Sequence, residues 1–298
     1  MRKNRFLVVT VLSVAIVCTT TFVSCKKDKS EEPNITYTLT VLSNDNKMGT
    51  VTGSGSYTEG TEATLTATPA SEACVFVKWS DGNTENPRTL TVTENMELTA
   101  TFGYAFVDLG LPSGVKWAAC NVGATTPEGY GGYFAWGETE TKGDYTWDTY
   151  KWCNGSSSTM TKYCVNSKFG TVDNKTTLEP EDDAAHVNWG GAWRMPTDAE
   201  CQELIDNCTW TWTSDYNGTG VAGRIVTSNI NGKSIFLPAA GQWNNSYTLN
   251  TEIYYWNSSL SGTYQSKYHY NTIYGKESEF YMGSYLRYAG QTIRGVCE

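Results

Sequence analysis

The sequence predicts a mainly β protein with one clear helix, an α+β composition. Only 18% of its 298 residues are charged, whereas Gly (28), Tyr (19) and Trp (11) are abundant. Low charge combined with many glycines and aromatic residues favours short strands and tight turns over long helices. Several segments alternate apolar residues with threonines, and only one segment shows helical periodicity. The length is sufficient for two domains of ordinary size.

The predicted helix begins after Thr197. Thr197 suits the N-cap position, and Glu200 three residues later completes the pattern of a capping box. Four apolar residues then follow at the i, i+3, i+4 and i+7 positions: Cys201, Leu204, Ile205 and Cys208. This stripe predicts that one face of the helix packs on a core. A buried strand is expected to begin at Ser234 and to be ended by Pro238 and Gly241.

The first 24 residues have the pattern of a secretory signal peptide. Basic residues at positions 2, 3 and 5 precede an apolar run over residues 6–18. This run is too short for a transmembrane helix, which needs about 20 residues. Residues 22–25 (Phe-Val-Ser-Cys) resemble a bacterial lipobox, and the resemblance implies that Cys25 is acylated in an outer-membrane lipoprotein. The alternative is an ordinary cleaved signal that ends near an incidental cysteine.

Residues 25–34 are predicted to be a lipidated tether, because this polar and charged stretch cannot form a core. Acidic residues soon after Cys25 resemble the surface-export signal of Bacteroidota lipoproteins. The resemblance implies that the protein is held in the outer membrane by lipid and faces the outside of the cell.

The net charge of the chain is −9. The first 24 residues hold three of the 22 basic residues and none of the 31 acidic ones, so the remainder has 19 against 31, a net charge of −12. Nucleic acid is therefore not an expected partner, because phosphate contacts need clusters of Lys and Arg.

Residues 35–103 are predicted to form a small all-β module. Apolar and polar residues alternate over 36–41, 63–68 and 96–102, with glycine-rich turns between these segments. The module resembles the bacterial repeat domain, the divergent internalin-type B-repeat, in six motifs: Gly49-Thr50-Val51, Gly55 to Gly60, Leu65 to Pro69, Trp79-Ser80-Asp81-Gly82, Asn86-Pro87-Arg88 and Leu98 to Phe102. The resemblance implies an extracellular spacer or weak adhesive. Trp79 is expected to pack in the core or in a turn, with a ligand contact as the alternative.

Residues 104–298 resemble the Fibrobacter-type major paralogous domain. The motifs that carry the resemblance are Val107 to Gly114, Trp117 to Ala124, Tyr133 to Thr139, Trp189 to Thr197, Ile235 to Gly241 and Tyr255 to Ser259. The segment 193–200 is also similar to the start of the helix in formylglycine-generating-enzyme-like folds. Together these resemblances imply a C-type-lectin-like domain, which has a twisted, irregular sheet, a helix and long loops. The cysteine pair of the true formylglycine-generating enzymes is not recognisable, so their activity is not implied.

Seven cysteines follow position 25, in a chain predicted to be exported to a compartment where disulfides form. Cys153 and Cys164 flank a polar turn and are the best candidates for a disulfide. The lectin-like resemblance implies a second bridge, between Cys208 and Cys297, from the helix to the last strand. The alternative is that all seven thiols are reduced and buried. Because the sequence holds no Cys-x-x-Cys pair, a zinc site is not expected.

No catalytic residue, metal site or cofactor is predicted. Only two histidines are present, His186 and His269, and the common hydrolase and phosphate-loop motifs are absent. Acidic residues cluster between Glu179 and Asp183, where carboxylate oxygens could hold Ca²⁺, with helix capping and solvated carboxylates as the alternative. A glycoside hydrolase needs two carboxylates at a set separation, which a sequence does not fix. The resemblance favours a non-catalytic protein.

A tyrosine-rich segment from Trp243 to Tyr288 is the predicted binding site. It holds ten of the 19 tyrosines, together with seven serines and five asparagines. These residue types dominate antibody paratopes, because Tyr provides a large amphipathic contact at low entropic cost. The alternative is a polar outer face of a sheet. The predicted ligand-binding residues are Trp243, Tyr247, Tyr254, Tyr255, Tyr264, Tyr268, Tyr270, Tyr274, Tyr281 and Tyr285.

The sequence therefore predicts a cell-surface lipoprotein with a non-catalytic, adhesin-like head of lectin type that binds an unknown glycan or protein. The alternative is a structural or assembly component of the cell envelope, and a carbohydrate-active enzyme ranks third. A large exposed aromatic patch would favour binding, whereas a flat polar surface with an open β edge would favour assembly.

Overall fold

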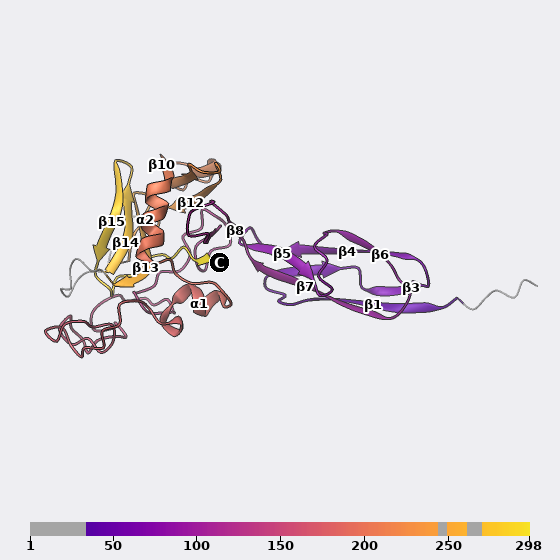
Figure 1. Cartoon of the computed structure of the whole chain (residues 1–298), viewed down its shortest axis with the longest axis horizontal. Coiled ribbons are helices and arrows are strands. Elements are labelled where there is room, and N and C mark those ends of the chain that lie inside the picture. Colours follow the sequence, from indigo (N-terminus) through magenta and orange to yellow (C-terminus); the bar gives the residue numbers. More distant parts are fainter. Residues whose placement is uncertain (1–33, 244–248, 261–269) are drawn as a thin grey trace, which may run out of the picture. The chain divides into compact units, whose positions relative to one another are not determined.

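The computed structural model describes residues 34–243, 249–260 and 270–298 (Figure 1). The chain is mostly β, with 39% strand and 9% helix, which confirms the mainly β prediction. The described strands form five small sheets. None of the helices in the described part of the chain is long and apolar enough to cross a membrane.

Residues 36–104 fold into a module of two sheets. Its strands are β1 (Thr36–Ser43), β2 (Gly49–Thr52), β3 (Gly55–Thr58), β4 (Glu62–Pro69), β5 (Cys74–Trp79), β6 (Arg88–Thr91) and β7 (Met96–Tyr104). One sheet has the order β3-β1-β7-β5 and the other has the order β2-β4-β6. β1 and β7 pair in parallel, and the other pairs in both sheets are antiparallel.

The core of this module is built from the alternating apolar residues of both sheets. Its buried members include Leu39, Val41, Leu65, Ala67, Trp79, Leu98, Ala100 and Phe102. Trp79 is fully buried, and its indole Nε1 donates to the carbonyl oxygen of Glu85 at 2.9 Å. Trp79 is therefore a core residue, as expected. Gly49 is required by packing, because a Cβ at this position would lie 2.3 Å from the Phe102 ring.

The remaining described residues form the C-terminal module. Its strands are β8 (Phe106–Val107), β9 (Lys116–Ala118), β10 (Cys208–Thr213), β11 (Gly223–Ser228), β12 (Ser234–Pro238), β13 (Glu252–Leu260), β14 (Tyr270–Lys276), β15 (Glu279–Tyr285) and β16 (Val296–Cys297). Its helices are α1 (Ala184–Trp189) and α2 (Asp198–Asn207), with short 3-10 turns at Pro180–Asp182 and Tyr216–Gly218. The sheet orders are β16-β9-β8, β10-β11-β12 and β13-β14-β15, and α2 lies against the last of these (Figure 1). The predicted buried strand is β12.

The start of α2 is fixed by the predicted capping box. The Thr197 hydroxyl accepts from the amide of Glu200 at 3.3 Å, and the Glu200 carboxylate accepts from the amide of Thr197 at 2.8 Å. Arg194 donates to the same carboxylate twice, at 2.7 and 2.8 Å. Although burial alone would raise it, these contacts hold the pKa of Glu200 below its ordinary value.

Glu200→Gln should lower the free energy of unfolding by about 1–2 kcal/mol at neutral pH, because it removes the charged partner of Arg194 and weakens the cap. A carboxylate with a lowered pKa stabilises the fold at pH values above its pKa in the unfolded chain, which is about 4.3 for Glu. This contribution is lost as the pH falls through the pKa of the folded state. The variant should therefore lose less stability than the wild type on acidification to about pH 3. Urea unfolding at several pH values measures the difference. An identical pH dependence in the two proteins would contradict the role assigned to Glu200.

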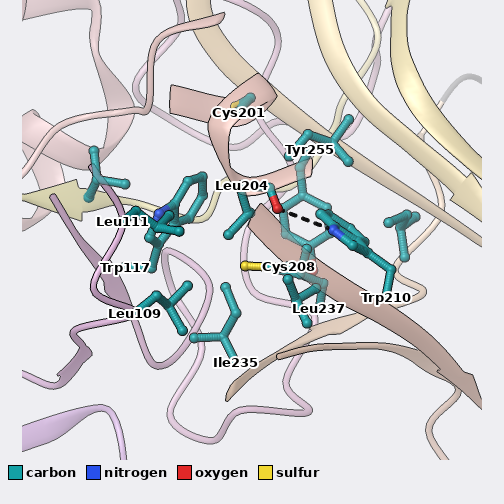
Figure 2. Packing of buried hydrophobic residues seen from close by; sticks show 14 of the residues in the cluster. Leu109, Leu111, Trp117, Cys201, Leu204, Cys208, Trp210, Ile235, Leu237 and Tyr255 are labelled. Atoms are coloured by element: carbon teal, nitrogen blue, oxygen red, sulfur yellow. Dashed lines mark hydrogen bonds between the residues drawn. The ribbon is translucent and has the colours of Figure 1, made fainter. Parts of the chain in front are cut away.

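The helix ends before its apolar stripe does. Cys201 and Leu204 are buried on α2, but the helix ends at Asn207 and Cys208 is the first residue of β10. The prediction of a helical Cys208 is therefore wrong, although its side chain packs in the same cluster as Leu204 and Ile235 (Figure 2). The apolar stripe therefore continues from the helix into the first residue of β10, and both parts face the core.

Neither predicted disulfide is formed. All seven cysteines in the described ranges are free thiols: Cys74, Cys120, Cys153, Cys164, Cys201, Cys208 and Cys297. The thiols of Cys153 and Cys164 each donate to a nearby backbone carbonyl oxygen, at 3.1 and 3.2 Å. Cys208 packs among apolar side chains while Cys297 lies in β16, and burial raises the pKa of both thiols. Five of the seven are buried and two are half-buried, which agrees closely with the alternative of reduced thiols.

Candidate ligand-binding groove

Three antiparallel strands, β13, β14 and β15, bring tyrosines of the predicted site together. The register pairs Tyr254 of β13 with Tyr274 of β14, and Tyr274 with Tyr281 of β15. Residues paired directly across antiparallel strands point to the same face of a sheet. Tyr285 lies four residues after Tyr281 in β15 and therefore shares that face.

These side chains line a hollow of about 520 Å³, called here the tyrosine groove. Its residues are Tyr254, Thr272, Tyr274, Tyr281, Met282, Gly283, Ser284 and Tyr285. Thr272 and Gly283 are direct cross-strand partners, so a pair of small residues lies beside the row of paired tyrosines. Tyr281 and Tyr285 are each two residues from Gly283, about 7 Å along the strand on either side. The groove therefore has a low floor between aromatic walls.

The tyrosine rings form one contiguous cluster. The Tyr274 ring centroid lies 5.0 Å from that of Tyr254 and 5.1 Å from that of Tyr281, and both pairs are tilted by 56°. The rings of Tyr254 and Tyr285 meet edge to face at 5.6 Å. Contacts of this kind stabilise a cluster by about 0.5–1.5 kcal/mol per pair beyond the buried area. Tyr254 is 8% exposed and Tyr281 is 48% exposed, so the cluster has a buried base and an accessible rim.

Hydrogen bonds hold the phenol groups of Tyr274 and Tyr285, and the pKa values of Tyr254 and Tyr274 are raised. The Tyr274 hydroxyl donates to Oε1 of Glu252 at 3.1 Å, and Nε2 of Gln242 donates to the Tyr285 hydroxyl at 2.8 Å. Burial, together with the Glu252 carboxylate, raises the pKa of Tyr274 to about 12. Burial also raises the pKa of Tyr254. The hydroxyl groups of Tyr254 and Tyr274 are therefore uncharged at neutral pH.

Two predicted residues lie elsewhere in the module. Tyr255 points to the opposite face of β13, where it is buried and its hydroxyl donates to the carbonyl oxygen of Pro238 at 3.1 Å. Trp243 belongs to a second aromatic group, with ring centroids 6.4 Å from Tyr133 and 6.3 Å from Tyr145. Tyr255 is a core residue, and Trp243 does not line the tyrosine groove.

The other predicted residues are only partly described. Tyr270 is the first residue of β14 and pairs with Tyr285, but its side chain is outside the described residues. Three further tyrosines of the predicted site and the predicted lipidation residue also lie outside them: Tyr247, Tyr264, Tyr268 and Cys25. Of the predicted residues whose side chains are described, Tyr254, Tyr274, Tyr281 and Tyr285 line the groove, whereas Tyr255 and Trp243 do not.

The two small residues between the aromatic walls of the groove, Thr272 and Gly283, were not among the predicted site residues. Gly283 and Thr272 are small and carry none of the composition signal that marks the tyrosines. A glycine in the middle of a strand pattern is nevertheless a signal, because it weakens the strand and often marks a position that another group approaches closely. Aromatic residues at Tyr281 and Tyr285 on either side of Gly283 make that pattern visible in the sequence.

The acidic cluster between Glu179 and Asp183 is bonded within the protein. Asp182 is buried and accepts from the Tyr163 hydroxyl at 2.7 Å, and it also pairs with Lys162. Asp183 caps α1 by accepting from the amide of His186 at 3.0 Å. In the described ranges no three His, Cys, Asp or Glu side chains are arranged to hold a metal ion. Asp183 therefore caps a helix, as in the alternative. Asp182 pairs with a lysine and is not a solvated carboxylate.

The comparisons with known proteins assign one part of the chain. No curated protein matches the sequence. No solved structure matches it. A family model does match the N-terminal module, within two residues of the predicted boundaries at either end. Residues 37–105 are a divergent InlB B-repeat domain, which confirms the predicted repeat.

Proposed function

We propose that this chain is a lipid-anchored cell-surface protein whose C-terminal module, residues 104–298, binds an extracellular ligand through the tyrosine groove. The observation that carries the proposal is the gathering of four tyrosines around one hollow, with the hydroxyl groups of Tyr274 and Tyr285 held by hydrogen bonds. Tyrosines of this kind supply a large contact area and hydrogen bonds at low entropic cost. The B-repeat at 37–105 would act as the spacer between the lipid anchor and this module.

A non-catalytic role fits the state of the acidic residues and of His186. Asp182 is neutralised by a lysine, and Asp183 is committed to a helix cap. His186 Nδ1 lies 3.1 Å from the carbonyl oxygen of Trp193, which gives this ring a structural partner. These contacts leave recognition as the role that the described residues support best. We further propose a C-type-lectin-like fold for the module, on the support of α2 with its capping box and of the sequence motifs around it.

Tyr281→Ala should weaken ligand binding by about tenfold or more, because Tyr281 is the accessible rim of the groove. The full chain, purified in detergent, is applied to a broad glycan array and to proteins extracted from cell surfaces. Phe106→Ala is the matched control: Phe106 is 48% exposed, as Tyr281 is, but lies in β8 of a different sheet.

Saturable binding that Tyr281→Ala reduces and Phe106→Ala preserves would support the proposal. Binding that both variants retain at full strength would place the recognition surface elsewhere. If neither glycans nor surface proteins bind the wild-type chain, recognition by this groove is wrong and a structural role takes precedence.

A further inference from the structure

The tyrosine groove follows the edge of a sheet. In the sheet order β13-β14-β15, β15 is the last strand, and the described residues place a paired strand on one side of it only. The groove is lined by five consecutive residues of β15, from Tyr281 to Tyr285. Successive side chains of a strand point to opposite faces, so a hollow lined by every residue in turn includes the backbone of the strand. A ligand in the groove therefore meets the main chain of β15 as well as its tyrosines.

The hairpin geometry shows which main-chain groups face the free side. A two-residue loop, Glu277 and Ser278, joins β14 to β15, and Lys276 pairs with Glu279 across it. In such a hairpin the closing residues form a hydrogen-bonded pair, and hydrogen-bonded and non-hydrogen-bonded pairs then alternate. The odd-numbered residues of β15 therefore bond to β14, while the amide and carbonyl groups of Phe280 and Met282 point to the free edge.

Gly283 is not required by the fold of β15 itself. A Cβ at Gly283 would meet the Cβ of Tyr274 and the ring of Tyr281 at 3.5 Å, which is ordinary van der Waals contact. Its backbone is not among the glycines with a positive φ. A glycine in the interior of a strand costs stability. Because position 283 would accept a Cβ without strain, the glycine there has a use outside the strand. That use is to leave space between Tyr281 and Tyr285.

We infer that the ligand is an extended polypeptide segment of another protein, which adds to β15 as a further strand. This inference rests on the proposed function of the groove. Main-chain groups at an edge strand are chemically complementary to the backbone of another strand, and added strands of this kind bind by main-chain hydrogen bonds with alternate side chains in pockets. The ligand residue opposite Gly283 is a large apolar or aromatic one, because such a side chain covers a cross-strand glycine and fits between the two tyrosines.

The test uses a displayed library of random linear peptides about 12 residues long, selected on the full chain in detergent. Selected peptides should share a large apolar or aromatic residue within an alternating pattern. Each is then resynthesised with single N-methyl groups at successive positions and titrated by calorimetry. Loss of affinity by about tenfold or more should occur at alternate positions within the segment that pairs with β15, because only alternate amides of an added strand bond to β15.

Gly283→Val fills the space between the tyrosines and should weaken the same peptides by about tenfold or more, whereas Phe106→Ala should not. Thermal unfolding of Gly283→Val should match the wild type, since valine is favoured in strands and the backbone of Gly283 has no positive φ. Should valine disturb the fold, Gly283→Ala is used in its place. Because alanine fills less of the space between the tyrosines, it should cause a smaller loss of affinity than valine. The methylation pattern does not depend on either variant.

Peptides that tolerate N-methylation at every position would overturn strand addition. Glycan binding without any peptide binding would also overturn it, while leaving the proposed function of the groove in place. Dimerisation of the chain that Gly283→Val abolishes would identify a second copy as the occupant and overturn the assignment to another protein.

Discussion

Replacing Arg294 with methionine should lower the free energy of unfolding of the C-terminal module by about 3–5 kcal/mol. Arg294 is 1% exposed, and its guanidinium is surrounded by oxygen acceptors from two separate segments, residues 118–121 and β12. It donates to Oδ1 of Asn121 at 2.8 Å and to the carbonyl oxygens of Ala118 at 3.0 Å, Ala119 at 2.6 Å and Phe236 at 2.7 Å. Methionine fills much of the volume but removes the donors of these buried acceptors. A buried acceptor without its donor pays the full desolvation penalty, which makes the loss large.

Urea unfolding followed by tryptophan fluorescence measures this loss. Arg88→Met in the B-repeat is the matched control, because Arg88 pairs at 2.8 Å with an Asp81 side chain that is 40% exposed. An ion pair with an exposed partner contributes about 0–1 kcal/mol, so the control should be nearly neutral. Equal effects of the two substitutions would mean that the guanidinium network of Arg294 does not hold the module together.

Trp79→Ala should destabilise the B-repeat by about 3–5 kcal/mol, the usual loss for a fully buried aromatic side chain. Trp79 packs 5.2 Å from the Phe76 ring between centroids and lies within the main apolar cluster of the module. The loss is comparable to the whole stability of a small domain. Amide hydrogen exchange should therefore show loss of protection across 36–104, while the C-terminal module keeps its own protection.

Trp79→Phe provides the control, because it keeps an aromatic ring in the core and loses only part of the packing and the bond to Glu85. Protection in the B-repeat should be largely retained in this variant. A B-repeat that stays fully protected in Trp79→Ala would contradict the core assignment and return Trp79 to the role of a ligand contact.

Local signals in the sequence predicted local structure well. The capping box at Thr197 and Glu200 sets the start of α2, because both partners lie within one helical turn. The alternation of Leu39 and Val41 gives the inner face of β1 for a similar reason, since strand periodicity is a property of neighbours. The turn from helix to strand at Cys208 was missed, because an apolar residue satisfies both periodicities at that point.

The candidate site depends on which distant residues pair across the strands. The amino-acid composition holds no information on this pairing. Tyr254 and Tyr255 are adjacent and chemically identical, yet one lines the groove and the other is in the core. Only the register of β13 with β14 and of β14 with β15 decides which tyrosines share a face. The prediction of a Cys153–Cys164 disulfide failed for the same reason, because bonding partners in space are not given by spacing along the chain. The Cys208–Cys297 prediction came from the lectin-like resemblance, and these two thiols are also free.

The most direct test of the central claim is amide hydrogen exchange of the full chain, with and without the first glycan or peptide that binds it. Ligand binding in the tyrosine groove should slow exchange in β15, Glu279–Tyr285, and the slowing should disappear in Gly283→Val. Slowed exchange confined to other surfaces at saturating ligand, or the same slowing in Gly283→Val, would contradict the assignment of the groove as the binding site.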